Sequence, residues 1–280
     1  MHPDLQRLLN ERFGAARLVE IARAGIPQRT VNELMASGEL VKLQRGVVQR
    51  PAIAAHWAQL RAQGIDVTCV TAARSLKLWV LDPHRDEFHV SYRRMPLRDA
   101  VLQARDRPRL ISHRRRTDNR TLDVILHAMH CLSEVEALVI AESAVVLKQV
   151  SLAEVRAASA HFVAERAIVD MLQPGSMSLL ETVGRYHLVK AGHIIQIQRY
   201  FERWGHIDGL VDGVLGIEFD GRESHDTPQG YQEDRRRNNM SVLHGVPTLR
   251  VTYDQVVHRP QEFIALVEAA LKRIHGGKFP

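Results

Sequence analysis

The fold of the C-terminal part is decided between residues 203 and 225, where the sequence reads Arg203-Trp204-Gly205-His206-Ile207-Asp208-Gly209-Leu210-Val211-Asp212-Gly213-Val214-Leu215-Gly216-Ile217-Glu218-Phe219-Asp220-Gly221-Arg222-Glu223-Ser224-His225. Asp-Gly is one of the strongest short signals for a β-hairpin, so Asp212-Gly213 predicts two antiparallel strands. Alternate residues of a strand share a face, which separates Glu218 and Asp220 from the apolar face of the second strand. The hairpin therefore predicts that three carboxylates, those of Asp208, Glu218 and Asp220, meet at one end of a small sheet.

Clustered carboxylates repel one another unless protons or a cation lie among them. Mg²⁺ prefers oxygen ligands and is commonly held by one or two carboxylates together with water and phosphate. Asp208 and Glu218 are therefore predicted ligands of Mg²⁺ or Mn²⁺. The simpler interpretation is that Asp208 and Asp212 are turn residues and that Glu218 and Asp220 lie on a solvated strand face. A further alternative is that Asp220 beside Gly221 fixes a turn.

The order of residues around the hairpin resembles the C-terminal domain of small proteins related to the very-short-patch repair endonucleases, within the PD-(D/E)XK nuclease superfamily. The resemblance covers roughly residues 176–271. It rests on Asp208, on Glu218-Phe219-Asp220-Gly221, on His225, and on a helix at 229–244 that carries Asp234 and Arg235. It implies a restriction-endonuclease-like αβββαβ core.

The same resemblance implies hydrolysis of DNA phosphodiester bonds, with Mg²⁺ held by Asp208 and Glu218 and a proton moved by His225. Asp234 and Arg235 would hold a loop or the phosphate. Asp220 stands where most of the superfamily has a lysine. The repair-endonuclease branch also lacks that lysine and uses an aspartate and histidines, so the resemblance implies that Asp220 is catalytic. This departure leaves a domain that keeps the fold without cutting as the alternative.

Glu181 has two interpretations. A helix is predicted over residues 178–190, and Ser178 followed three residues later by Glu181 is a capping-box pattern. In the nuclease superfamily a glutamate of this first helix often reaches the metal, so the resemblance adds Glu181 to the metal and catalytic residues. The two roles are compatible.

The N-terminal pattern predicts a winged helix-turn-helix. Helices are expected at 4–13, 15–24 and 28–37, followed by strands at 40–43 and 47–49. The third helix would place Gln28, Arg29, Thr30 and Asn32 in the major groove, and Arg45 at the hairpin tip would touch the DNA backbone. The alternative is a three-helix packing module with a solvated face.

This segment also resembles the N-terminal domain of AbiEi-type antitoxins. The resemblance rests on the sequence at 24–31, on Gly38-Glu39-Leu40-Val41, on Arg45-Gly46-Val47, and on the small-residue helix beginning near Val70. It implies a transcriptional autoregulator that binds DNA through a winged helix.

Charge is distributed unevenly along the chain. Residues 1–120 hold 22 Lys and Arg against 12 Asp and Glu, residues 121–174 hold 3 against 7, and residues 175–280 hold 13 against 13. The N-terminal excess favours an anionic partner, most simply nucleic acid. Within the charge run at 105–120, Arg114 and Arg115 are predicted to contact phosphate, the alternative being a solvated loop.

Composition places the chain among ordinary globular proteins, with 45% hydrophobic and 25% charged residues. No apolar run has the length of a membrane span, and the start lacks a signal-peptide pattern. Cys69 and Cys131 lie far apart without a CxxC partner, which predicts neither a zinc site nor a disulfide and favours the cytoplasm.

The predicted architecture is α/β (α+β overall) in three parts: a winged helix-turn-helix at 1–50, an antitoxin-like mixed and helical region at 51–172, and a nuclease-like domain at 176–280. The preferred hypothesis is a DNA-binding protein with a Mg²⁺-dependent endonuclease domain, acting in DNA repair or in defence against mobile elements. The alternative is an antitoxin-type transcriptional regulator with an inactive nuclease-like domain. DNA is the expected partner, beside a toxin or repair protein, and no membrane contact is expected.

Overall fold

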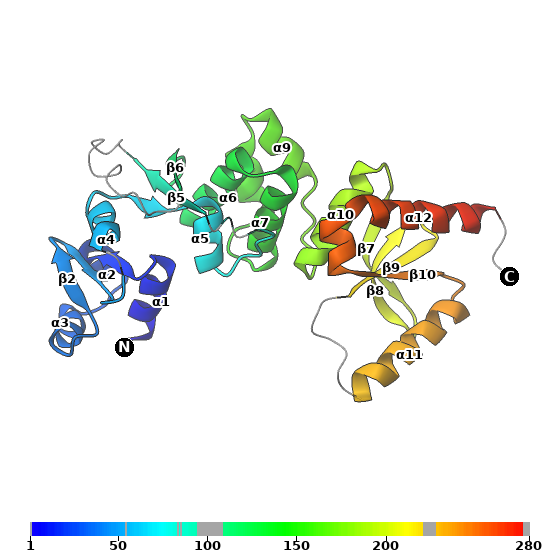
Figure 1. The fold of residues 1–280 in the computed structure, drawn as a ribbon, viewed down its shortest axis with the longest axis horizontal. Helices are drawn as coiled ribbons and strands as arrows, with labels where there is room; N and C mark the ends of the chain where they lie inside the picture. Colours follow the sequence, from blue (N-terminus) through cyan, green and yellow to red (C-terminus); the bar gives the residue numbers. More distant parts are fainter. Residues whose placement is uncertain are drawn as a thin grey trace. The chain divides into compact units, whose positions relative to one another are not determined.

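The computed structural model describes residues 2–53, 55–82, 84, 86–93, 109–220 and 228–276. The chain divides into two compact units, Met1–Val169 and Asp170–Pro280 (Figure 1). The described residues form a mixed α/β structure with three small sheets. Among them, no helix is both long enough and apolar enough to cross a lipid bilayer.

The first unit begins with a small helical module closed by a three-stranded antiparallel sheet. Its elements are α1 Pro3–Glu11, β1 Ala15–Arg17, α2 Leu18–Arg23, α3 Gln28–Ala36, β2 Val41–Gln44 and β3 Val47–Gln49. The strand order is β1-β3-β2. Leu5, Leu9, Ile21, Val31 and Leu34 are among the residues of its apolar core.

The prediction of a single helix over residues 15–24 is wrong in its first turn. Ala15–Arg17 pairs with β3, Ala15 opposite Gln49 and Arg17 opposite Val47, so the helix begins only at Leu18. The third helix begins at Gln28, directly after Pro27, where the sequence predicts it.

The rest of the first unit combines a second sheet with a helical layer. Its elements are α4 Ala55–Ala62, β4 Asp66–Val67, α5 Cys69–Ser75, β5 Glu87–Tyr92, β6 Arg109–Arg114, α6 Arg120–Cys131, α7 Glu134–Val146, α8 Leu152–Ser159 and α9 Val163–Asp170. In the order β4-β5-β6, β5 and β6 run parallel. Helices α6 and α7 are separate because Ser133 and Glu136 form a capping box that starts α7.

A buried ion-pair network joins the N-terminal module to the region that follows it. Arg61 of α4 is fully buried and forms salt bridges with Glu20 of α2 and with Asp66, the latter at 3.0 Å. Arg12 also pairs with Asp66, and Arg17 with Glu20. The boundary predicted at residue 50 therefore lies inside one compact unit.

The second unit carries a four-stranded sheet between helices. Its elements are α10 Leu179–Lys190, β7 Ile195–Phe201, β8 Gly205–Val211, β9 Leu215–Asp220, α11 Pro228–Leu243, β10 Thr248–Thr252, the π-helical turn η2 Asp254–His258, and α12 Pro260–His275. The strand order is β10-β9-β8-β7, with β10 parallel to β9. Figure 1 shows α10 and α12 on one side of this sheet and α11 on the other.

The predicted hairpin forms, with Leu215 of β9 opposite Val211 of β8. Asp212 and Gly213 have positive φ angles of 48° and 75°, as a type I′ turn requires, and the Val214 N–H donates to the Val211 carbonyl at 3.1 Å. This turn sets the register that carries Asp208 and Glu218 to the same level of the sheet.

Candidate functional site

A row of polar side chains crosses the sheet of the second unit at one level. Gly209 pairs with Ile217, so the preceding residue, Asp208, stands level with Glu218. Arg250 of β10 pairs with Glu218 on the other side. On β7, Gln198 occupies the corresponding place and has a positive φ of 50°.

Asp208 is the most perturbed carboxyl of this row. Burial raises its pKa to about 6, and the negative charges of Glu181 and Glu218 act in the same direction. The Phe219 N–H, which donates to its Oδ2 at 2.8 Å, and the positive charge of Arg237 oppose the increase. Close to neutral pH, Asp208 therefore exchanges a proton that an ordinary aspartate would have lost.

Glu218 is buried and neutralised by arginines. It forms a salt bridge with Nη2 of Arg237 on α11, and its Oε2 lies 3.4 Å from the Nε of the same guanidinium. Arg250 Nη2 lies 3.6 Å from Oε2. Arg237 also donates to the His206 carbonyl at 2.8 Å, which fixes the guanidinium against β8.

Glu181 holds the start of α10. Its backbone N–H donates to the Ser178 side-chain oxygen at 3.1 Å, and its carboxylate accepts from the Met177 N–H at 2.9 Å. The same carboxylate accepts from Gln198 Nε2 at 3.0 Å. The helix-starting role is therefore present, while the negative charge of Glu181 still acts on Asp208.

The arginines around Glu218 disfavour a Mg²⁺ ion at this place. Among the described residues, no group of three or more His, Cys, Asp or Glu side chains whose ligand atoms all lie within 4.8 Å of one another includes Asp208, Glu218 or Glu181. Two guanidinium groups already neutralise Glu218, and a cation would have to displace them or bind beside them against their charge.

The other predicted residues of the second unit lie on or near β9 and α11 in the sequence. Asp220 is half-buried at the end of β9, and Arg235 is exposed on α11. His225 and the side chain of Asp234 lie outside the described residues.

The predicted DNA-reading residues lie on one module. Gln28, Arg29 and Asn32 are exposed on α3 and Thr30 is half-buried, whereas Val31 and Leu34 face the apolar core. Gln28 donates to Asn32 at 3.1 Å, and Arg29 donates to Glu33 at 2.7 Å. The exposed Arg45 occupies the turn between β2 and β3, where Gly46 has a positive φ of 77°.

A second basic surface occurs where β6 ends. Arg93, Arg114, Arg115 and Arg116 line a hollow of about 250 Å³ together with Thr117 and Asp118. Asp118 pairs with Arg93, and Arg116 pairs with Glu165 at 2.5 Å. Four arginines face one lining aspartate and Glu165, so the hollow has a net positive charge, and Arg114 is exposed. The predicted phosphate-binding residues Arg114 and Arg115 thus line the same hollow as Arg93 and Arg116.

The expectation that Cys69 and Cys131 lie without metal-ligating partners is wrong. Their side chains gather with His89 and His113, and the ligand atoms of all four lie within 4.8 Å of one another. Sequence reasoning missed this group because its members come from four separate elements and no two are close in sequence.

Comparison with known proteins gives one partial match. Residues 4–51 match the model of a family described as "Transcriptional regulator, AbiEi antitoxin". This match covers α1 to β3, the module that carries the exposed face of α3. No curated protein matches the chain.

Proposed function

We propose that this protein is a DNA-binding transcriptional regulator of the antitoxin type, in which the N-terminal module is a winged helix that reads DNA through α3. The observation that carries the proposal is the match of residues 4–51 to an antitoxin and transcriptional-regulator family, together with the polar outer face of α3 in that same segment. A cognate toxin is the proposed protein partner, since the matched family is described as an antitoxin.

The chemistry of α3 supports base reading. Glutamine and asparagine side chains form paired hydrogen bonds with adenine, and arginine does so with guanine. Gln28, Arg29 and Asn32 supply these groups on one exposed helix face, and Val31 and Leu34 anchor its other side in the core. Their present hydrogen bonds, within the helix and solvent-exposed, are weak enough to exchange for base contacts.

Two further basic groups support contact with the DNA backbone. Arg45 at the β2–β3 turn corresponds to the tip of a wing, and the arginine-lined hollow presents Arg114 and Arg115 for phosphate. Arginine suits this task because its planar fork binds two phosphate oxygens at once. These contacts would position the protein on DNA without adding sequence information.

For the second unit we propose a nuclease-like fold that does not cut DNA. The order α10-β7-β8-β9-α11-β10 supports the fold, and the arginine-neutralised Glu218 supports the loss of cleavage. In this proposal Arg237 and Arg250 supply the positive charge that a cation would bring to an active nuclease.

The experiment compares binding with cleavage in one preparation of the full chain. Supercoiled, linear, nicked and mismatched DNA are incubated with Mg²⁺ or Mn²⁺, and binding is measured in parallel in EDTA. Wild type is compared with Asp208→Ala and Glu218→Ala, and Asp212→Asn in the hairpin turn serves as the acidic control.

The proposal predicts binding in EDTA and no cutting by any variant. Metal-dependent cutting by wild type and Asp212→Asn that disappears in both Asp208→Ala and Glu218→Ala would overturn it in favour of the endonuclease. Absence of DNA binding by the wild-type chain at low salt would overturn the regulator as well.

A further inference from the structure

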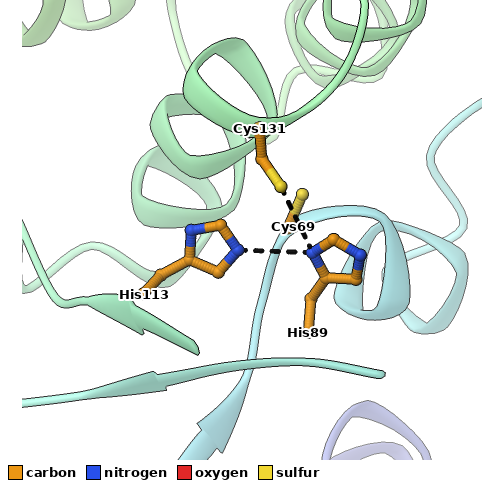
Figure 2. Close-up of side chains that lie close together, drawn as sticks. All are labelled: Cys69, His89, His113 and Cys131. Atoms are coloured by element: carbon orange, nitrogen blue, oxygen red, sulfur yellow. Dashed lines mark hydrogen bonds between the residues drawn. The ribbon is translucent and has the colours of Figure 1, made fainter. Parts of the chain in front are cut away.

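We propose that Cys69, His89, His113 and Cys131 form a structural Zn²⁺ site in the first unit, here called the Cys₂His₂ centre. Figure 2 shows the four side chains converging on one point from separate elements. Cys69 starts α5, His89 lies on β5, His113 lies on β6 and Cys131 ends α6.

Two of the six distances between the ligand atoms match the edges of a tetrahedron around zinc, and the other four lie within 4.8 Å. With Zn–S of about 2.3 Å and Zn–N of about 2.05 Å, tetrahedral angles separate two nitrogens by about 3.3 Å and a sulfur from a nitrogen by about 3.6 Å. His89 Nδ1 and His113 Nε2 lie 3.3 Å apart, and Cys131 Sγ lies 3.7 Å from His89 Nδ1. Two thiolates and two imidazoles are a preferred ligand set for zinc.

The surroundings orient the ligands as a metal site requires. Glu87 Oε2 lies 3.1 Å from His89 Nε2, so His89 donates its Nε2 proton there and turns the Nδ1 lone pair toward the centre. His113 stacks on His127 with ring centroids 4.7 Å apart, and His127 is held by the Thr68 hydroxyl at 2.7 Å. These contacts fix both imidazole planes.

The backbone also supports the centre. The Thr68 N–H donates to the His89 carbonyl at 3.0 Å, and the His89 N–H donates to the Thr71 hydroxyl at 2.9 Å, which ties the start of α5 to β5. Cys69 has a φ of 51°, a conformation that costs free energy for any residue with a side chain and is frequent at functional sites.

All four ligands come from the protein, and Cys69, His89 and His113 are buried while Cys131 is exposed. A closed set of this kind is typical of structural rather than catalytic zinc, and the exposed cysteine provides the entry path. The ion would join β5, β6, α5 and α6. Since Arg114 and Arg115 follow His113 directly, it would also fix the strand that carries the arginine-lined hollow.

The test measures binding of Zn²⁺ and Co²⁺ alone to the reduced full-length chain. Zinc stoichiometry is measured by elemental analysis after chelation and reloading, and affinity by competition with a chromophoric chelator. Co²⁺ loading reports geometry through its visible absorption. The variant is Cys131→Ser, and the matched control is His130→Asn, a neighbouring histidine that is exposed on α6 and outside the centre.

Two further variants distinguish zinc bound at this centre from zinc bound elsewhere on the chain. Glu87→Gln keeps all four ligands and should weaken zinc binding by about 10–100-fold, because it removes the carboxylate that orients His89. His84→Asn disrupts the other group of close ligands among the described residues, Asp82, His84 and Glu136, and should leave zinc binding unchanged.

The expected result is one zinc ion per chain in wild type, His130→Asn and His84→Asn, with loss in Cys131→Ser. Co²⁺ should give the strong visible bands of a tetrahedral, thiolate-ligated ion, which tests the proposal in wild type even if Cys131→Ser fails to fold. No metal uptake by the reduced wild type would overturn it. Retention of zinc by folded Cys131→Ser would also overturn it. An intact mass lower by two hydrogens, from a Cys69–Cys131 disulfide that the reductant does not reduce, would overturn it as well.

Discussion

Replacing Glu20 by glutamine should destabilise the first unit strongly at neutral pH and only weakly at pH 3. Burial of Glu20 opposes its ionisation, but the charge of Arg61, hydrogen bonds from Arg61 and Arg17, and the charge of Arg12 outweigh that cost and lower its pKa to about 2. The side chain is 9% exposed, so solvent screens these interactions little.

The magnitude follows from the difference between the ordinary pKa of 4.5 and the folded value of about 2. The difference of 2.5 units, at 1.36 kcal/mol each, gives about 3 kcal/mol at pH 7. Because the folded pKa is lowered, this stability is present above pH 4.5 and is lost as the pH falls toward 2. At pH 3 the same relation leaves about 1 kcal/mol.

Urea denaturation followed by Trp57 fluorescence measures this difference. Trp57 donates its ring N–H to the Arg12 carbonyl at 2.9 Å and so reports on the network, provided that Trp79 and Trp204 are replaced by phenylalanine. Glu33→Gln is the control, because Glu33 pairs with Arg29 on an exposed helix face and should contribute less than about 0.5 kcal/mol. Equal losses for Glu20→Gln and Glu33→Gln at pH 7, or the same loss at pH 3 as at pH 7, would refute the reasoning.

Asp208→Asn should stabilise the second unit above pH 6 by up to about 3 kcal/mol and should have no effect below pH 4. Because the folded pKa of Asp208 is raised to about 6, protonated Asp208 stabilises the fold, and this stability is lost as the pH rises from 3.8 to 6. Thermal unfolding at pH 4 and pH 8 checks this, and a variant less stable than wild type at pH 8 would contradict it. Gly184→Ala should destabilise the same unit by about 1–3 kcal/mol, because the added Cβ would lie 2.1 Å from the Phe219 ring. Gly192→Ala is the comparison for backbone strain in the same thermal unfolding experiments, since its added Cβ would meet no atom within 4 Å but Gly192 has a φ of 93°. Arg114→Ala should reduce the slope of the logarithm of the DNA-binding constant against the logarithm of salt concentration by about 1, as expected for one lost phosphate contact. Arg7 is exposed on α1 and paired with Asp4, so Arg7→Ala should leave the slope unchanged.

The local patterns of this sequence predict its local structure well. Asp212-Gly213 forms the expected hairpin, and Ser178 caps the start of α10 by accepting from the Glu181 N–H, as the sequence predicts. Such signals involve residues close in the chain, where turn geometry and caps leave few alternatives. The strand at Ala15–Arg17 was not predicted, because its pairing partner, β3, lies about 30 residues away in the sequence.

The candidate site shows more clearly that local patterns do not predict contacts between residues far apart in the chain. The register of the hairpin places Asp208 beside Glu218, as the sequence predicts. The role of Arg237 was not predictable, since α11 brings it to Glu218 only through the fold. The Cys₂His₂ centre is the extreme case, because Cys69 and Cys131 are 62 residues apart and the sheet supplies the two histidines between them.

The regulator proposal is tested most directly by the sequence preference of DNA binding. DNA selected from a random pool by the full-length chain in EDTA provides the site, and fluorescence anisotropy at fixed salt gives the affinity for the selected and for an unrelated duplex. Gln28→Ala on α3 is compared with Gln6→Ala, an equally exposed glutamine on α1.

If α3 reads bases, Gln28→Ala should lose about 1–3 kcal/mol of discrimination between the two duplexes while its affinity for the unrelated duplex stays the same. Gln6→Ala should behave as wild type. Equal discrimination by wild type and Gln28→Ala, or no selected sequence at all, would contradict the proposal that this helix reads DNA.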